Sequence, residues 1–321
     1  MKSIRNLFLS FALLFTGALA HADSQDLWYS STSDSSTQHA IYFYSPQVKP
    51  RATLLFVHGM QSHAEWLRAS RVGHSLADAG IAVLAYDRRG SGRSSTTRGH
   101  ADSAEILIRD LDDARAIFRK RLSEDKRIPN PNGIEMHLMA NCFGARIAVP
   151  YLIGAQNVKS FPFSTLTLIA PSTHMTKQAD YSVPEKLSVL TRPRLEYLAT
   201  PLRNEWFTTY GPGLEWIEND SLGLHQVTAG FLRSASSLTK IMERNIYSMQ
   251  FPLLIFTAKQ DVMVDSAGVK RDLYTPYRGP KRLVEIDSEH SLEFSRGSKA
   301  TYVRATIDWI LGSGRQVWKT R

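Results

Sequence analysis

Short apolar runs alternate along this chain with segments that place their apolar residues at helical spacing. The runs are rich in β-branched residues, which favour strands, and the segments between them have the period of amphipathic helices. The predicted strands cover residues 38–45, 52–59, 81–87, 133–140, 164–171, 252–258 and 282–287, and the predicted helices cover 65–79, 103–122, 144–153, 266–274 and 300–311. Strands that alternate with helices predict an α/β fold in which helices flank a mostly parallel sheet.

This alternation breaks once, between residues 172 and 249, where helical patterns continue without a convincing strand. We interpret 23–171 and 250–321 as the core, and 172–249 as a helical cap over the carboxyl ends of the strands, where open α/β sheets bind ligands. The cap is rich in aromatic residues, namely Tyr181, Tyr197, Trp206, Phe207, Tyr210, Trp216 and Phe231. These rings either line a pocket for an acyl group, with Trp206 and Phe207 as substrate contacts, or pack the cap onto the sheet.

The first residues have the layout of a secretory signal peptide. Lys2 and Arg5 precede an apolar run from Leu7 to Ala20, and small-residue cleavage patterns end at Ala20 and Ala22. The run is shorter than the roughly 20 residues that span a bilayer, which disfavours a membrane anchor. We therefore expect residues 1–22 to be removed and the protein to be exported, to a periplasm or to the medium.

Charge and composition narrow the range of partners. The formal net charge of +9 falls to +7 without Lys2 and Arg5, and the positive charges are spread along the chain. This pattern favours a solvated surface, or attraction to anionic lipid, over nucleic-acid binding. The histidines lack a recognised metal-ligand spacing, and the glycine-rich segment 88–94 lacks the Lys-Ser/Thr ending of a nucleotide-binding loop. We expect no metal and no cofactor.

The single cysteine, Cys142, lies between a predicted strand and a predicted helix. Ala140 and Gly144 flank it at the spacing of the G-x-S-x-G nucleophile elbow, in which a sharp turn requires small neighbours and exposes the nucleophile. Alanine replaces the first glycine of that motif, and cysteine replaces the serine. A lone cysteine among apolar residues is more often inert core material, so the motif by itself leaves both interpretations open.

A second segment, residues 54–66, supplies a candidate oxyanion hole. A predicted strand ends at His58-Gly59 and opens into a loop, as in the segment that donates an oxyanion amide in this architecture. The backbone N–H groups of Met60 and Phe143 are the expected donors. His58 is expected to hold this loop beside the substrate and not to act as a base.

Two later strands each end near a residue that suits a catalytic triad. Asp261 follows one strand as the candidate acid, and His290 follows the last strand as the candidate base. The chain order Cys142, Asp261, His290 is nucleophile, acid and base, which is the order of α/β-hydrolase triads. Asp265 is expected to be a helix cap or a surface charge.

Two further segments extend the pattern. The segment from Asp87 to Ser95 is similar to the motif D-x-R-G-x-G-x-S, and residues 215–232 are similar to N-D-P-L…T…F-L, with Ser221 in place of proline. With these motifs, residues 38–311 resemble the monoacylglycerol lipase-like and lysophospholipase-like group of α/β-hydrolases, of the serine aminopeptidase S33 type. The resemblance implies an α/β-hydrolase fold, acyl substrates that are lipid-like or small, and triad and oxyanion roles for the residues named above.

The cysteine leaves the outcome of the reaction open, because the group usually has serine at this position. A thiol ionises more readily beside an imidazolium than a hydroxyl does, and attack on an ester would give a thioester intermediate. Three hypotheses follow: an acyl hydrolase with a Cys-His-Asp triad, an acyltransferase with the same triad, and a non-catalytic protein that binds a ligand or a protein partner.

Overall fold

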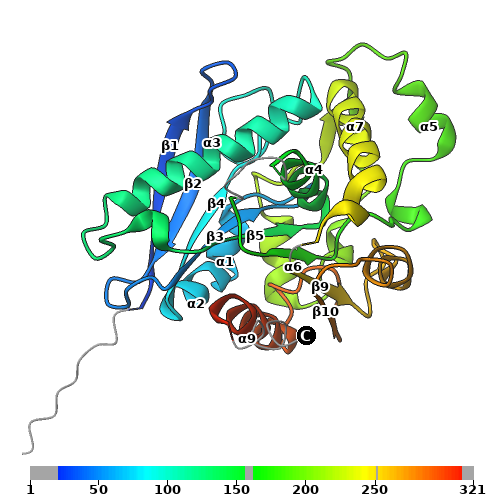
Figure 1. The fold of residues 1–321 in the computed structure, drawn as a ribbon. Helices are drawn as coiled ribbons and strands as arrows, with labels where there is room; N and C mark the ends of the chain where they lie inside the picture. Colours follow the sequence, from blue (N-terminus) through cyan, green and yellow to red (C-terminus); the bar gives the residue numbers. More distant parts are fainter. Residues whose placement is uncertain (1–20, 156–161, 251, 313–321) are drawn as a thin grey trace, which may run out of the picture.

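The computed structural model describes residues 21–155, 162–250 and 252–312, so almost all of the predicted signal peptide lies outside the described residues. One sheet of eight strands runs through the molecule in the order β1-β2-β4-β3-β5-β6-β9-β10 (Figure 1). All neighbouring strands from β4 to β10 are parallel, whereas β1 with β2 and β2 with β4 are antiparallel. The predicted mostly parallel sheet is confirmed.

The strands of the sheet follow the apolar runs of the sequence. They are β1 (Asp23–Ser30), β2 (Thr37–Tyr44), β3 (Ala52–Val57), β4 (Ile81–Tyr86), β5 (Met136–Asn141), β6 (Leu166–Ile169), β9 (Leu253–Ala258) and β10 (Lys281–Ile286). Every residue of β3, β4, β5 and β9 is buried, because helices cover both faces of the sheet at these strands.

Helices on the two faces form two apolar cores. The helices are α1 (Glu65–Ala69), α2 (Val72–Asp78), α3 (Ala104–Ser123), α4 (Ala145–Ala155), α5 (Val183–Ser188), α6 (Gly211–Glu218), α7 (Ala229–Asn245), α8 (Ser266–Gly268) and α9 (Ser298–Leu311). One core joins α3, α4 and α7 to the sheet, and the other joins α2 and α9 to its opposite face (Figure 1). No helix in the described part of the chain is both long and apolar enough to span a bilayer.

The structure departs from the predicted elements in three places. The edge strand β1 was not predicted, because all of its residues are at least partly exposed and its sequence lacks an apolar run. The helix predicted over 65–79 is two helices, since Arg71 between them has φ +64°. The cap also contains a short antiparallel ladder of β7 (Tyr197–Ala199) and β8 (Gln226–Thr228), which is too brief to produce an alternating pattern.

The D-x-R-G-x-G-x-S segment is a structural junction beside the site. The Asp87 carboxylate accepts hydrogen bonds from the amides of Ala64 and Arg93 and contacts Nδ1 of His39 at 2.7 Å. A Cβ on Gly92, which has φ +54°, would lie 2.1 Å from that carboxyl group. Asp87 therefore requires a glycine in this turn, and it joins the turn after β4 to strand β2 and to the segment after β3.

Candidate active site

Cys142 lies at the turn between β5 and α4, in the strained conformation of a nucleophile elbow. Its φ is +48°, a left-handed value that is uncommon for a residue with a side chain. A Cβ on Gly144 would lie 2.3 Å from the carbonyl oxygen of Val57, so the chain needs glycine there. The close approach of β3 to this turn explains the small residue two positions after Cys142.

His290, after β10, and Asp261, after β9, form a close pair. Nδ1 of His290 lies 2.7 Å from Oδ2 of Asp261, and both side chains are almost completely buried. The other carboxylate oxygen of Asp261 accepts hydrogen bonds from the amides of Met263 and Val264, which fix its orientation. Cys142 and His290 line one small cavity, so the fold brings the three predicted residues together.

The charge state of His290 depends on its two acidic neighbours. Burial by itself lowers the pKa of His290, but the negative charges of Asp261 and Cys142, with hydrogen bonds to both, outweigh it. The pKa of His290 is therefore raised well above its ordinary value. A protonated His290 beside a thiolate is the form that a Cys-His pair needs to attack a carbonyl carbon.

The expected oxyanion residues lie beside Cys142, and Met60 also lines the small cavity that contains His290. Met60 and Phe143 line the same larger cavity as Cys142. The buried Arg88 supports this loop, since its Nη2 donates to the carbonyl oxygen of Met60 at 3.0 Å and its guanidinium carbon lies 5.1 Å from the centre of the Phe143 ring. Burial lowers the pKa of Arg88 to about 10, which leaves it charged at neutral pH.

His58 holds the loop that carries Met60, and it is not among the described residues that line the two cavities beside Cys142. Its side chain is fully buried; Nδ1 donates to the carbonyl oxygen of Gly59, and Nε2 accepts from the amide of Arg88. Burial and the charge of Arg88 lower the pKa of His58 to about 3. The sequence-based proposal of His58 as a substrate contact therefore does not fit the structure, because both ring nitrogens already bond the backbone.

The cap aromatics divide between the two interpretations. Phe207 lines the small cavity, and its ring centre lies 5.7 Å from that of His290 in an edge-to-face arrangement. Trp206 does not line either cavity beside Cys142 among the described residues; its ring lies 5.4 Å from the Arg203 guanidinium. Phe207 and Trp216 also join a cluster with the core residues Trp66 and Phe294. Phe231 packs against Phe143, and Tyr181 lines the larger cavity. Packing therefore explains some of the cap aromatics, and others line the cavities.

Two charged residues of the site were not predicted. Arg146, in the first turn of α4, follows Cys142 by four residues, and both line the larger cavity, of about 580 Å³. Glu293 is almost fully buried behind the triad, where Nδ2 of Asn141 lies 3.5 Å from its carboxylate. The i+4 spacing from Cys142 was a signal for Arg146, whereas only the tertiary fold reveals the burial of Glu293.

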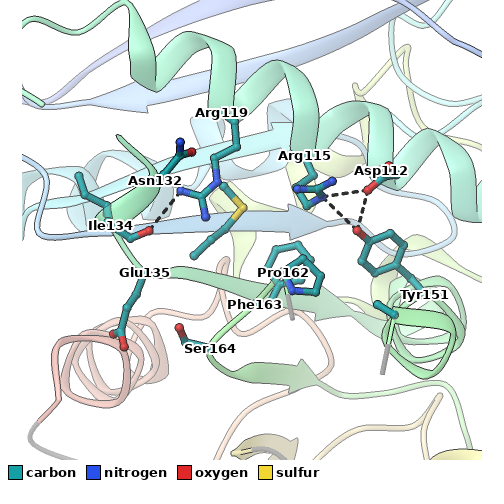
Figure 2. A pocket seen from close by; sticks show the side chains of 13 residues that line it. Asp112, Arg115, Arg119, Asn132, Ile134, Glu135, Tyr151, Pro162, Phe163 and Ser164 are labelled. Carbon is teal, nitrogen blue, oxygen red and sulfur yellow. Dashed lines mark hydrogen bonds and ion pairs between the residues drawn. The ribbon is translucent and has the colours of Figure 1, made fainter. Parts of the chain in front are cut away.

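A second large hollow, of about 610 Å³, lies at the opposite end of the strands (Figure 2). Its wall includes Met136, the first residue of β5, whereas Cys142 follows the last residue of that strand. In this hollow, Asp112, Arg115 and Tyr151 bond one another, and Arg119 donates to backbone carbonyls (Figure 2). These internal partners explain its charged side chains without a ligand.

Comparisons with known proteins agree with this architecture. Residues 48–287 match the model of a family described as serine aminopeptidase, S33. A Dictyostelium discoideum protein, described as an uncharacterized abhydrolase domain-containing protein, is 40% identical over 80 residues. That match covers 25% of this chain and 8% of the relative, so the chain accounts for a small part of that protein's length.

Solved structures of two lipases share the fold. A monoglyceride lipase from Saccharomyces cerevisiae has a TM-score of 0.74 at 17% identity, over 91% of this chain and 95% of the lipase. The monoacylglycerol lipase of Paleococcus ferrophilus has a TM-score of 0.71 at 16% identity, over 86% of this chain and 98% of the lipase. The span matched by the family model covers most of the chain, includes Cys142 and Asp261 and ends shortly before His290. This chain therefore belongs to the serine aminopeptidase S33 family, within the α/β-hydrolases.

Proposed function

We propose that this protein hydrolyses carboxylic esters of lipid-like or small acyl groups, with Cys142 as the nucleophile. The observation that carries the proposal is the placement of Cys142 at a strained elbow, in one cavity with a His290 that contacts Asp261 at 2.7 Å. The lipase structures with the same fold support an acyl substrate.

In the proposed reaction, the Cys142 thiolate attacks the ester carbonyl carbon, and the amides of Met60 and Phe143 stabilise the negative oxygen that forms. His290 donates its proton to the departing alkoxide, which leaves as the alcohol, and the acyl group remains on sulfur as a thioester. His290 then accepts a proton from water as the water attacks the thioester. The carboxylic acid leaves, and the thiolate and imidazolium are restored.

The test measures kcat/KM with p-nitrophenyl esters and monoacylglycerols for the wild type and for Cys142→Ala and His290→Ala. Each variant should lower kcat/KM by roughly 10³-fold or more, because the triad acts as a unit. His174→Ala is the matched control, since His174 is a partly exposed histidine outside the triad that pairs with Asp272. Ester hydrolysis that persists in Cys142→Ala would overturn the proposal. An amine acceptor added to the assay distinguishes acyl transfer, in which the amide product increases at the expense of the acid.

We further propose that the cap docks on anionic lipid. Four apolar side chains on α5 and the turns after it, those of Val183, Leu187, Leu190 and Leu195, are between 61% and 69% exposed. An exposed apolar group of this kind is typical of an interaction surface. Leu190 also lines the larger cavity, so a lipid surface on this side would lie beside that cavity.

We also propose export through a signal peptide of residues 1–22. The mass of the protein recovered from a periplasmic fraction tests it.

A further inference from the structure

The larger cavity beside Cys142 has a positive wall. Six charged side chains line it, of which four are cationic and two acidic: Arg146, Lys186, Arg233, Lys240, Asp180 and Glu243. Lys186 forms an ion pair with Asp180, and Glu243 lies one helical turn from Lys240 on α7. The charges of these two acids offset those of the two lysines. Arg146 and Arg233 then leave the cavity with two excess positive charges.

Arg146 is held in place by two residues. Its Nε and Nη2 donate to Ser172, in the segment after β6, and its Nη1 donates to the hydroxyl of Thr239 on α7. The amide of Ser172 in turn donates to the carbonyl oxygen of Cys142 at 3.2 Å. A guanidinium has five N–H donors, and one bond from each nitrogen leaves one N–H free on each of Nη1 and Nη2.

Arg233, on α7, lines the same cavity and is anchored in a similar way. Its Nη1 and Nη2 donate to the backbone carbonyls of Leu190 and Arg192, while its buried Nε has no hydrogen-bond partner among the described residues. Arg146 and Cys142 line the same cavity. Burial lowers the pKa of Arg146, and the charges of Cys142, Asp180 and Glu243 partly oppose that shift. Two anchored guanidinium groups with uncommitted donors form a recognition site for an oxyanion.

We propose that the substrate of this site carries a fixed negative charge, a carboxylate or a phosphate, that Arg146 binds while the acyl carbonyl lies at Cys142. This inference deepens the proposed ester hydrolysis and names its substrate class. Arg146 contacts the substrate, and Arg233 contributes a positive potential along the cavity.

The test uses the single cysteine and needs no turnover. The rate constants for alkylation of Cys142 by iodoacetate and by the neutral iodoacetamide are measured by intact mass, and their ratio is compared between variants. Because protonated His290 also attracts iodoacetate, the decisive comparison is Arg146→Gln with the wild type. We expect Arg146→Gln to lower the ratio by roughly tenfold and Arg146→Lys to lower it less, because a charge-assisted bond to the anion is lost. Arg115→Gln, which removes the same charge from the other hollow, should leave the ratio unchanged.

Two further measurements make the result independent of the folding of one variant. Arg233→Gln alters a side chain that bonds only backbone carbonyls of the cap, and it should lower the ratio by a smaller factor. High salt should reduce the ratio of the wild type. An equal ratio in the wild type and Arg146→Gln would overturn the proposal, and so would failure of both reagents to reach Cys142. Neither result depends on ester hydrolysis, which is judged separately with Cys142→Ala.

Two pairs of esters then locate the charge. The first pair compares mono-p-nitrophenyl adipate, which has a carboxylate on the acyl side, with p-nitrophenyl hexanoate. The second pair compares hexanoyl glycerol phosphate, which has a phosphate on the leaving group, with hexanoyl glycerol. The charged member of one pair should have the higher kcat/KM in the wild type, and this preference should disappear in Arg146→Gln. Preference for the neutral member in both pairs would contradict the proposal.

Discussion

Glu293 is an acidic side chain in a place that disfavours its charge. Burial raises the pKa of its carboxyl group to about 6, although its own backbone amide and the charge of His290 oppose the shift. Burial, together with the charge of Glu293, raises the pKa of the Tyr302 phenol, and Nδ2 of Asn141 is the hydrogen-bond partner of Glu293. A buried group with few partners for its charged form destabilises the protein wherever it is ionised.

We predict that Glu293→Gln stabilises the protein at pH 8 and has little effect near pH 4. The folded-state pKa of about 6 exceeds the ordinary 4.5, so the native state binds the proton more tightly. This contribution to stability is complete below pH 4.5 and is lost as pH rises through about 6. The difference corresponds to about 2 kcal/mol in the free energy of unfolding. Urea denaturation of both proteins across this pH range measures it, and a gain that does not grow with pH would contradict the burial argument.

Gly144 permits the approach of β3 to the elbow, and another glycine of the same helix region provides its control. A Cβ at Gly144 would lie 2.3 Å from a backbone oxygen, whereas a Cβ at Gly154 would meet nothing within 4 Å. We predict that Gly144→Ala lowers the free energy of unfolding by roughly 3 kcal/mol and moves Cys142 out of register with His290. Gly154→Ala should raise it by about 0.5 kcal/mol, because alanine favours the helix. Equal effects of the two substitutions in urea denaturation would refute the steric explanation.

At the scale of elements, a buried carboxylate joins the cap to the core. Asp220, just after α6, contacts Nε2 of His63 at 2.8 Å and accepts from Nε1 of Trp66 at 3.0 Å, and it also accepts from the amide of Leu222. His63 and Trp66 belong to the loop and helix that follow β3, so two of these three bonds join the cap to the core. Asp220 is also the aspartate of the cap motif recognised in the sequence.

We predict that Asp220→Ala lowers the free energy of unfolding by roughly 3 kcal/mol, because it leaves buried partners of the carboxylate unsatisfied. Asp220→Asn should lower it less, since the amide oxygen still accepts from Trp66 and Leu222. Glu218→Ala is the control, because Glu218 is an exposed residue of α6 and should change stability by less than about 0.5 kcal/mol. If chemical denaturation gives the same loss for Glu218→Ala, the tie between cap and core does not depend on Asp220.

At the scale of the whole molecule, the proposed lipid surface has a direct test. Lys186, Arg192 and Arg194 lie among the exposed apolar residues of the cap, where cations favour an anionic bilayer, although Lys186 pairs with Asp180 and Arg192 with Glu196. We predict that the double variant Val183→Gln, Leu187→Gln weakens cosedimentation with vesicles of phosphatidylglycerol and phosphatidylcholine by about tenfold. The variant loses two apolar side chains that the bilayer would bury.

Val48→Gln is the control for that experiment, since Val48 is an exposed apolar residue on the core, in the loop after β2. Cosedimentation of the wild type should also fall as salt increases, because salt screens the attraction of the cations. Binding that is unaffected by the double variant would exclude α5 as the docking element.

The chain order and local patterns were enough to anticipate the sheet, most of its helices and the grouping of Cys142, Asp261 and His290. Strands buried on both faces produce apolar runs, and parallel strands bring residues at their carboxyl ends to one edge whatever their separation in sequence. These properties are local or follow from topology, so the sequence by itself determined them.

Only the tertiary structure decided the features that depend on distance between separate elements. The burial of Glu293, the bonds that occupy both nitrogens of His58, the pair of His63 with Asp220 and the positive wall formed by Arg146 and Arg233 each require side chains from different parts of the chain to meet. A short ladder such as β7 with β8 has too few residues to form a periodic pattern. An exposed edge strand such as β1 does not need an apolar run. Sequence periodicity records which face of an element is buried, and it carries no information on which charged group lies opposite another, because that is fixed only when the elements pack.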